Sequence, residues 1–123
     1  MALLVPVSLG ELIDKITILE IKAVKITNIE AVRNVEKELD ALRTVPRPNV
    51  DQDLVNELKQ VNMDLWDVED ELRLVEKDKF FDHTFIGMAR SVYLLNDKRA
   101  SIKRQINTLY NSDIKEEKSY AKY

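Results

Sequence analysis

Residues 54–75 read LVNELKQVNMDLWDVEDELRLV, and this stretch decides the fold. Seven of its apolar residues are spaced alternately four and three residues apart: Leu54, Leu58, Val61, Leu65, Val68, Leu72 and Val75. This spacing places one apolar stripe along a helix, as in the seam of a coiled coil. The sequence therefore predicts a long helix from about Asp51 to about Lys77 that must pack against another helix.

A second long helix is predicted after a break at residues 80–82. Its apolar residues repeat the spacing with one exception, Arg99: Phe85, Met88, Val92, Leu95, Ile102, Ile106 and Leu109. Because the connection is short, we expect an antiparallel hairpin about 40 Å long at about 1.5 Å per residue. Charge favours this pairing, since residues 51–78 carry ten acids and three bases whereas residues 79–123 carry nine bases and five acids.

Two shorter helices are predicted ahead of this hairpin. Ser8 followed by Glu11 is the signature of a helix start with a capping box, and Thr27-Asn28 marks a second start. The second helix must end at Pro46-Arg47-Pro48, because proline lacks the backbone donor that a helix requires. We expect an all-α four-helix bundle in which a shorter hairpin joins the long one and oligomerisation completes the packing.

Composition limits the classes of function. The 123 residues suit a single domain, 1–123, with residues 112–123 as a polar C-terminal tail. The lack of cysteine and the single histidine, His83, exclude thiol chemistry and a Cys/His zinc site, and we expect no cofactor. A net charge of -3 argues against nucleic acid as a partner, and no apolar run is long enough for a membrane span, so we expect a cytoplasmic protein.

Several polar residues fall on faces that the apolar pattern turns inward. Arg99 lies in the apolar arc of its helix, so we expect it to be buried and paired with an inward-facing acid, Glu20 or Glu69. Such a network can serve only to fix helix register. Alternatively, it can form a pocket in which Arg99 and Lys103 bind a carboxylate or phosphate. The candidate ligand-binding residues are Glu20, Asn62, Glu69, Asn96, Arg99 and Lys103.

Other apolar residues lie outside the predicted seams and indicate a subunit interface. The candidate interface residues are Ile18, Ile21, Met63, Trp66 and Leu74. With no catalytic constellation visible, the sequence favours a noncatalytic interaction or structural protein that forms homo-oligomers. The alternative is a small enzyme or binding protein for an anionic metabolite centred on Arg99. No catalytic or metal-binding residue is predicted.

The chain also contains strings that occur together in a known family. In order they are PVSLGELIDK with TILEIK (6–15 and 17–22), LWDVED (65–70), FIGMARSVY with NDKRA (85–93 and 96–100), and EEKSY (116–120). With these strings the chain resembles, over nearly its whole length, a family of short proteins from bacteria and marine phages or metagenomes that carries only a domain-of-unknown-function label. The resemblance implies no activity or cofactor. It does imply that Glu20, Asn96, Asp97 and Arg99 belong to recurring strings.

Overall fold

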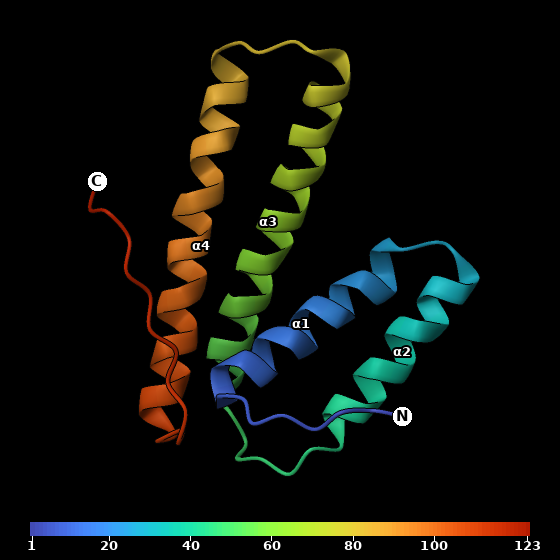
Figure 1. Cartoon of the computed structure of the whole chain (residues 1–123), viewed down its shortest axis with the longest axis vertical. Coiled ribbons are helices and arrows are strands. Elements are labelled where there is room, and N and C mark those ends of the chain that lie inside the picture. Colours follow the sequence, from blue (N-terminus) through green and yellow to red (C-terminus); the bar gives the residue numbers. More distant parts are fainter.

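The computed structural model describes residues 1–123 and contains four helices and no strand. Helix α1 spans Leu9–Lys25, α2 spans Ile29–Arg43, α3 spans Gln52–Asp78 and α4 spans His83–Leu109. Helices α3 and α4 form a long antiparallel pair, and the shorter α1/α2 hairpin crosses the lower half of that pair obliquely (Figure 1). The predicted all-α fold and its two hairpins are confirmed.

Residues at the helix ends explain the short connections. Ser8 precedes α1 and its Oγ accepts the backbone N–H of Glu11 at 3.1 Å, as predicted for the helix start. Lys79 ends α3 in the left-handed conformation, with φ 57°, and Asp82 caps α4 by accepting the Phe85 N–H at 3.2 Å. The chain therefore reverses direction between α3 and α4 within a few residues.

Helix α1 is the central helix, because it is covered on two opposite faces. One face packs on α2 through Leu12, Ile16, Leu19, Val35 and Leu39. The other packs on α3 and α4 around Ile13, Leu58, Val61, Leu65, Ile102 and Ile106. The predicted seam of α4 does not extend to Leu109, which is 63% exposed at the last residue of the helix.

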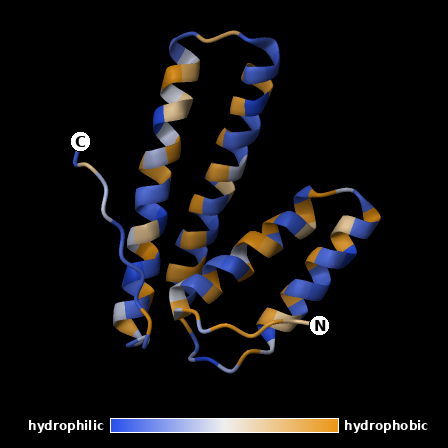
Figure 2. Ribbon diagram, viewed as in Figure 1, coloured by the Kyte–Doolittle hydropathy of each residue, from blue (hydrophilic) through white to orange (hydrophobic).

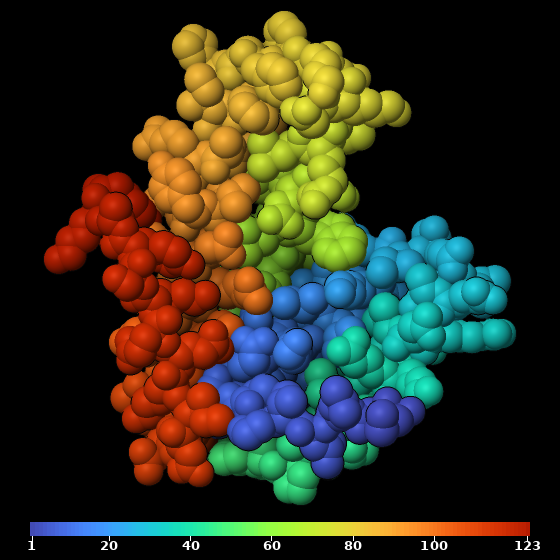
Figure 3. All heavy atoms as spheres, in the orientation of Figure 1, coloured from blue at the N-terminus to red at the C-terminus, as the bar shows by residue number.

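The upper half of the α3/α4 pair has no such cover. Helix α1 ends beside the middle of α3, where Lys25 Nζ lies 3.5 Å from Asp67 Oδ1. All 19 buried residues fall within 8–65 or 102–107. We call residues 68–95, which extend beyond α1, the outer hairpin; it forms the upper part of the molecule in Figure 3.

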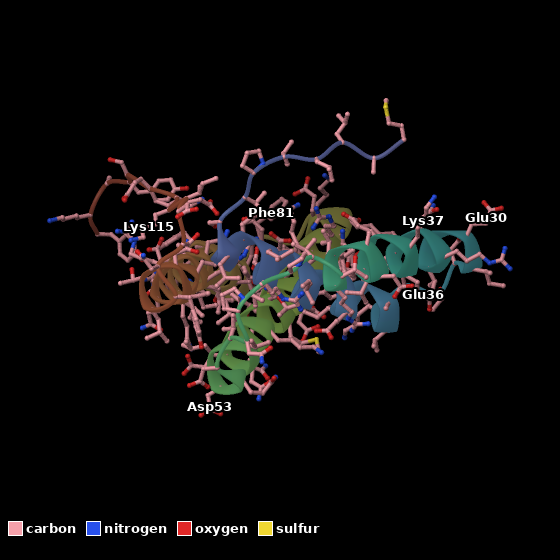
Figure 4. All side chains as sticks on the ribbon, turned by 90° about the horizontal axis from the view of Figure 1, so that it is seen from below. Glu30, Glu36, Lys37, Asp53, Phe81 and Lys115 are labelled. Atoms are coloured by element: carbon pink, nitrogen blue, oxygen red, sulfur yellow. The ribbon has the colours of Figure 1, made fainter.

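The chain ends lie outside the helices. The apolar residues 1–7 are exposed and stand away from the helices (Figure 4). Residues 110–123, here called the C-terminal segment, contain no helix and lie along α4 (Figures 1 and 3). None of the four helices combines the length and the apolar character that a membrane crossing requires.

Candidate functional site

A buried carboxylate, Asp14 of α1, lies where α1 crosses the long pair. Its side chain has no exposed surface. Arg99 of α4 binds it through two nitrogens, since Nε donates to Oδ1 at 2.9 Å and Nη2 donates to Oδ2. A charge removed from water is costly unless it is paired, and a guanidinium that binds both carboxylate oxygens is an effective partner. The pair therefore fixes α1 against α4.

Asn62 and Thr17 complete the surroundings of Asp14. The Nδ2 group of Asn62, on α3, donates to Asp14 Oδ1 at 2.9 Å and to Thr17 Oγ1 at 3.0 Å. The Thr17 hydroxyl in turn donates to the backbone carbonyl of Asp14 at 2.8 Å. Every buried side-chain nitrogen and oxygen in the structure has a hydrogen-bond partner. On this side the polar network is closed and joins three helices.

Lys103 lies one turn after Arg99 and belongs to the same network. Its Nζ is 2.6 Å from Glu11 Oε2 and 3.2 Å from Glu116 Oε1. Burial lowers the pKa of Lys103, but the hydrogen bond to Glu11 and the charges of Asp14 and Glu11 outweigh it, so the pKa is raised above 10.5. The hydrogen bonds to Asp14 raise the pKa of Arg99 as well, against the effect of burial. Both side chains are fixed cations at neutral pH.

Two side chains later in the sequence, Asn107 of α4 and Ser112 of the C-terminal segment, accept hydrogen bonds from the first turn of α1. Gly10 N–H donates to Asn107 Oδ1 at 2.7 Å, and Leu9 N–H donates to Ser112 Oγ at 3.1 Å. A helix start leaves its first amides without partners in the helix, so these bonds satisfy donors that are otherwise unpaired. A Cβ at residue 10 would lie 2.6 Å from the Lys103 carbonyl oxygen, and only glycine permits this close crossing.

Arg99 and Lys103 also line a pocket between α4 and the C-terminal segment. Its volume is about 690 Å³. The C-terminal segment adds two more cations to its wall, Lys118 and Lys122, whereas Asp97 of α4 is the one carboxylate side chain in the lining. The site thus has two sides: a closed polar network toward α1 and α3, and an open, cation-lined pocket toward the C-terminal segment.

Three of the predicted ligand-binding residues line this pocket. They are Arg99, Lys103 and Asn96. Asn62 does not join them, because its amide is buried in the closed network against Asp14. Helix α4 lies between α3 and the C-terminal segment, so a residue of α3 cannot reach the pocket on the far side.

The prediction that Arg99 pairs with Glu20 or Glu69 is wrong. Glu20 instead lies 2.8 Å from Arg43 Nη2 and 3.5 Å from Lys59 Nζ, where α1 meets α2 and α3, and Glu69 is exposed. Neither acid contacts Arg99, whose partner is Asp14. Apolar periodicity reveals one buried face of α1, whereas Asp14 lies on a second face that packs against α3 and α4.

The predicted interface residues are divided between the interior and the surface. Ile21 is only 2% exposed within one chain, so it is unavailable to a second subunit, and its assignment to an interface is wrong. Leu74 lies in the outer hairpin and is 54% exposed. Ile18, Met63 and Trp66 are half-buried, and their part in an interface stays a prediction.

Asp14 and Thr17 were not among the predicted site residues, but the sequence contains a signal for them. Gly10, Asp14, Thr17 and Ile21 are spaced four, three and four residues apart and are all buried. This stripe follows the same helical period as the apolar face of α1, on the opposite side of the helix. Only one of its four members is a large apolar residue, so a search for apolar periodicity overlooks it.

Comparison with known proteins agrees with the resemblance seen in the sequence. A family model described as a family of unknown function, DUF6165, matches residues 3–123. A search of curated proteins and a search of solved structures each returned no match. The match includes all residues of the polar network and of the pocket.

Proposed function

We propose that this chain, which belongs to the family of unknown function DUF6165, is a noncatalytic helical interaction protein that pairs with a second copy of itself through the outer hairpin. The supporting observation is that no residue from 66 to 101 is buried within one chain. Helices in proteins draw most of their stability from packing an apolar face. A hairpin of two helices gives each helix a single neighbour, so the outer hairpin needs further cover.

The apolar character of the outer hairpin supports a partner there. Apolar residues recur along both helices up to the turn (Figure 2). Large exposed side chains include Leu74 on α3, Phe80 and Phe81 at the turn, and Ile86 and Leu94 on α4. Exposed apolar residues gathered at one end of a protein are typical of a contact surface. Half-buried seam residues such as Leu72 and Val75 would gain a second layer of packing on association.

Charge favours a second copy as the occupant. Within the outer hairpin, residues 68–78 of α3 carry five acids and two bases, whereas residues 83–95 of α4 carry one base, Arg90, and no acid. In a two-fold symmetric pair each surface patch meets its own equivalent, so α3 of one copy can lie against α4 of the other. That arrangement brings the acidic stretch of α3 against the Arg90 side of α4 at both contacts and avoids placing two acidic stretches together. The two outer hairpins would together form four helices packed as in a coiled coil.

Light scattering after size-exclusion chromatography tests this proposal. We expect a mass of twice 14.3 kDa for the parent protein at micromolar concentrations. Ile86→Glu puts a charge on the outer hairpin and should give monomers. Ile29→Glu is the matched control, because Ile29 is also exposed, at 69%, but lies at the start of α2. A parent protein of 14.3 kDa throughout, or equal dissociation of both variants, would overturn the proposal.

A further inference from the structure

We infer that the pocket between α4 and the C-terminal segment binds a small molecule that carries a carboxylate or phosphate on a flat aromatic ring. Its volume of about 690 Å³ suits such a ligand, because small-molecule pockets hold roughly 300–1,000 Å³. One wall belongs to α4 and the other to residues 118–123. Two lining residues, Val92 and Tyr93, belong to the outer hairpin, but the cations of the site, Arg99, Lys118 and Lys122, lie outside it, so anion binding can be tested separately from self-association.

Three cations in the wall are available to an anion. Lys118 and Lys122 form no ion pair or hydrogen bond with any group of the protein. Arg99 uses Nε and Nη2 on Asp14, which leaves Nη1 without a protein acceptor. Because Asp14 already holds the guanidinium in place, a ligand would lose little affinity in ordering it. We therefore assign the anionic group to Arg99, Lys118 and Lys122.

The remaining charges of the wall fit this assignment. Lys103 is shared by Glu11 and Glu116, so it contributes less to an incoming anion than the two free lysines. Asp97 would repel an anion, but the Tyr123 hydroxyl donates a hydrogen bond to one of its oxygens. The charged side chains of the lining are thus four cations and one carboxylate, and the two cations without a protein partner, Lys118 and Lys122, lie on the C-terminal segment.

Aromatic residues line the part of the pocket nearest the end of the chain. The rings of Tyr93 and Tyr123 meet edge to face, with centroids 5.2 Å apart, and Val92 and Ala100 supply apolar wall beside them. Tyr120 also lines the pocket, and its hydroxyl makes no hydrogen bond within the protein. Aromatic rings pack favourably against one another in such edge and offset geometries. The combination indicates a ligand with a ring at one end and the anion at the other.

Phenyl phosphate is a probe that joins both features, and calorimetric titration of the full chain measures its affinity. We expect it to bind more tightly than either inorganic phosphate or phenol, each of which supplies one half of the interaction. Lys118→Gln combined with Lys122→Gln should weaken phenyl phosphate binding by about tenfold, since two charge contacts are removed. Tyr120→Ala should weaken phenol and phenyl phosphate but leave inorganic phosphate unchanged.

Lys115→Gln is the matched control. Lys115 belongs to the same segment and is exposed, but it does not line the pocket (Figure 4). Binding by this variant should equal that of the parent. If Lys115→Gln weakened binding as much as the double variant, the attraction would be a general effect of net charge. That result, or a parent protein that fails to bind phenyl phosphate, would overturn the inference.

Discussion

Arg99 forms an ion pair with the fully buried carboxylate of Asp14, 85 residues earlier in the sequence, and this pair joins the first helix to the last. The two partners differ in exposure, since the Arg99 side chain is 29% exposed and Asp14 has no exposed surface. Loss of the arginine leaves an acid that water reaches poorly, whereas loss of the acid leaves a cation that water can solvate. Loss of Arg99 should therefore lower the stability of the protein more than loss of the Asp14 carboxylate.

Arg99→Ala should lower the free energy of unfolding by about 3 kcal/mol, because it leaves Asp14 buried without its main partner. Urea denaturation measures the change. Combining Arg99→Met with Asp14→Asn removes both charges and should restore much of the loss. Arg104→Ala is the control, since its pair with Glu117 is largely exposed and should contribute less than about 1 kcal/mol. Equal midpoints for Arg99→Ala and the parent would refute a structural role for the pair.

Ser8→Ala should destabilise the protein by about 1 kcal/mol, because the Glu11 N–H loses the acceptor that caps α1. Glu11 was expected to complete a capping box with Ser8, but its carboxylate binds Lys103 at 2.6 Å instead. In double-mutant cycles Glu11 should therefore couple to Lys103. The effects of Ser8→Ala and Glu11→Ala on denaturation midpoints should be closer to additive, and strong coupling between them would restore the capping-box assignment.

Local sequence rules predicted the helices and their starts well. Ser8, Asn28 and the prolines after α2 act over a few residues, and the seam of α3 is regular enough to reveal its length. Tertiary pairing was less predictable. The choice between Glu20 and Asp14 as the partner of Arg99 depends on how α1 is rotated between α2 and the long hairpin, and an apolar pattern on one face of α1 does not determine that rotation.

The pocket was predicted only in part, for a related reason. Arg99, Lys103 and Asn96 lie on α4 at helical spacing, so their common face could be predicted from the sequence. The opposite wall comes from a segment without regular structure. Its position depends on individual contacts, such as Glu116 with Lys103 and Glu117 with Arg104, and no periodic pattern indicates them.

The two glycines should respond in opposite ways to substitution by alanine. Gly10→Ala places a Cβ 2.6 Å from the Lys103 carbonyl oxygen, which is backbone and cannot move aside, so α1 and α4 must separate. Gly87 lies in α4 with open space around it, and Gly87→Ala should raise stability by about 0.5–1 kcal/mol through the helix preference of alanine. Thermal denaturation at one protein concentration compares the two. A Gly10→Ala protein as stable as the parent would contradict the close crossing.

Acid should release the C-terminal segment from α4 before the helices unfold. Burial raises the pKa of Glu116, but the hydrogen bond and charge of Lys103 outweigh this effect and lower the pKa below 4.5. The Glu116–Lys103 contact therefore stabilises docking fully above pH 4.5 and is lost as the pH falls through the lowered value. On the alkaline side the contact persists to pH 10.5, because the pKa of Lys103 is raised above that value.

Heteronuclear NMR relaxation of the backbone amides of residues 116–123 measures this release. The amides should be rigid at neutral pH and become mobile as the pH falls below 4.5, while the amides of α4 remain rigid. Glu116→Gln should make the segment mobile at neutral pH, whereas Glu117→Gln should not, because the Glu117 side chain is 75% exposed in its pair with Arg104. A segment that stays rigid in Glu116→Gln would show that Tyr123 and its contacts with Asp97 and Tyr93 hold it without the ion pair.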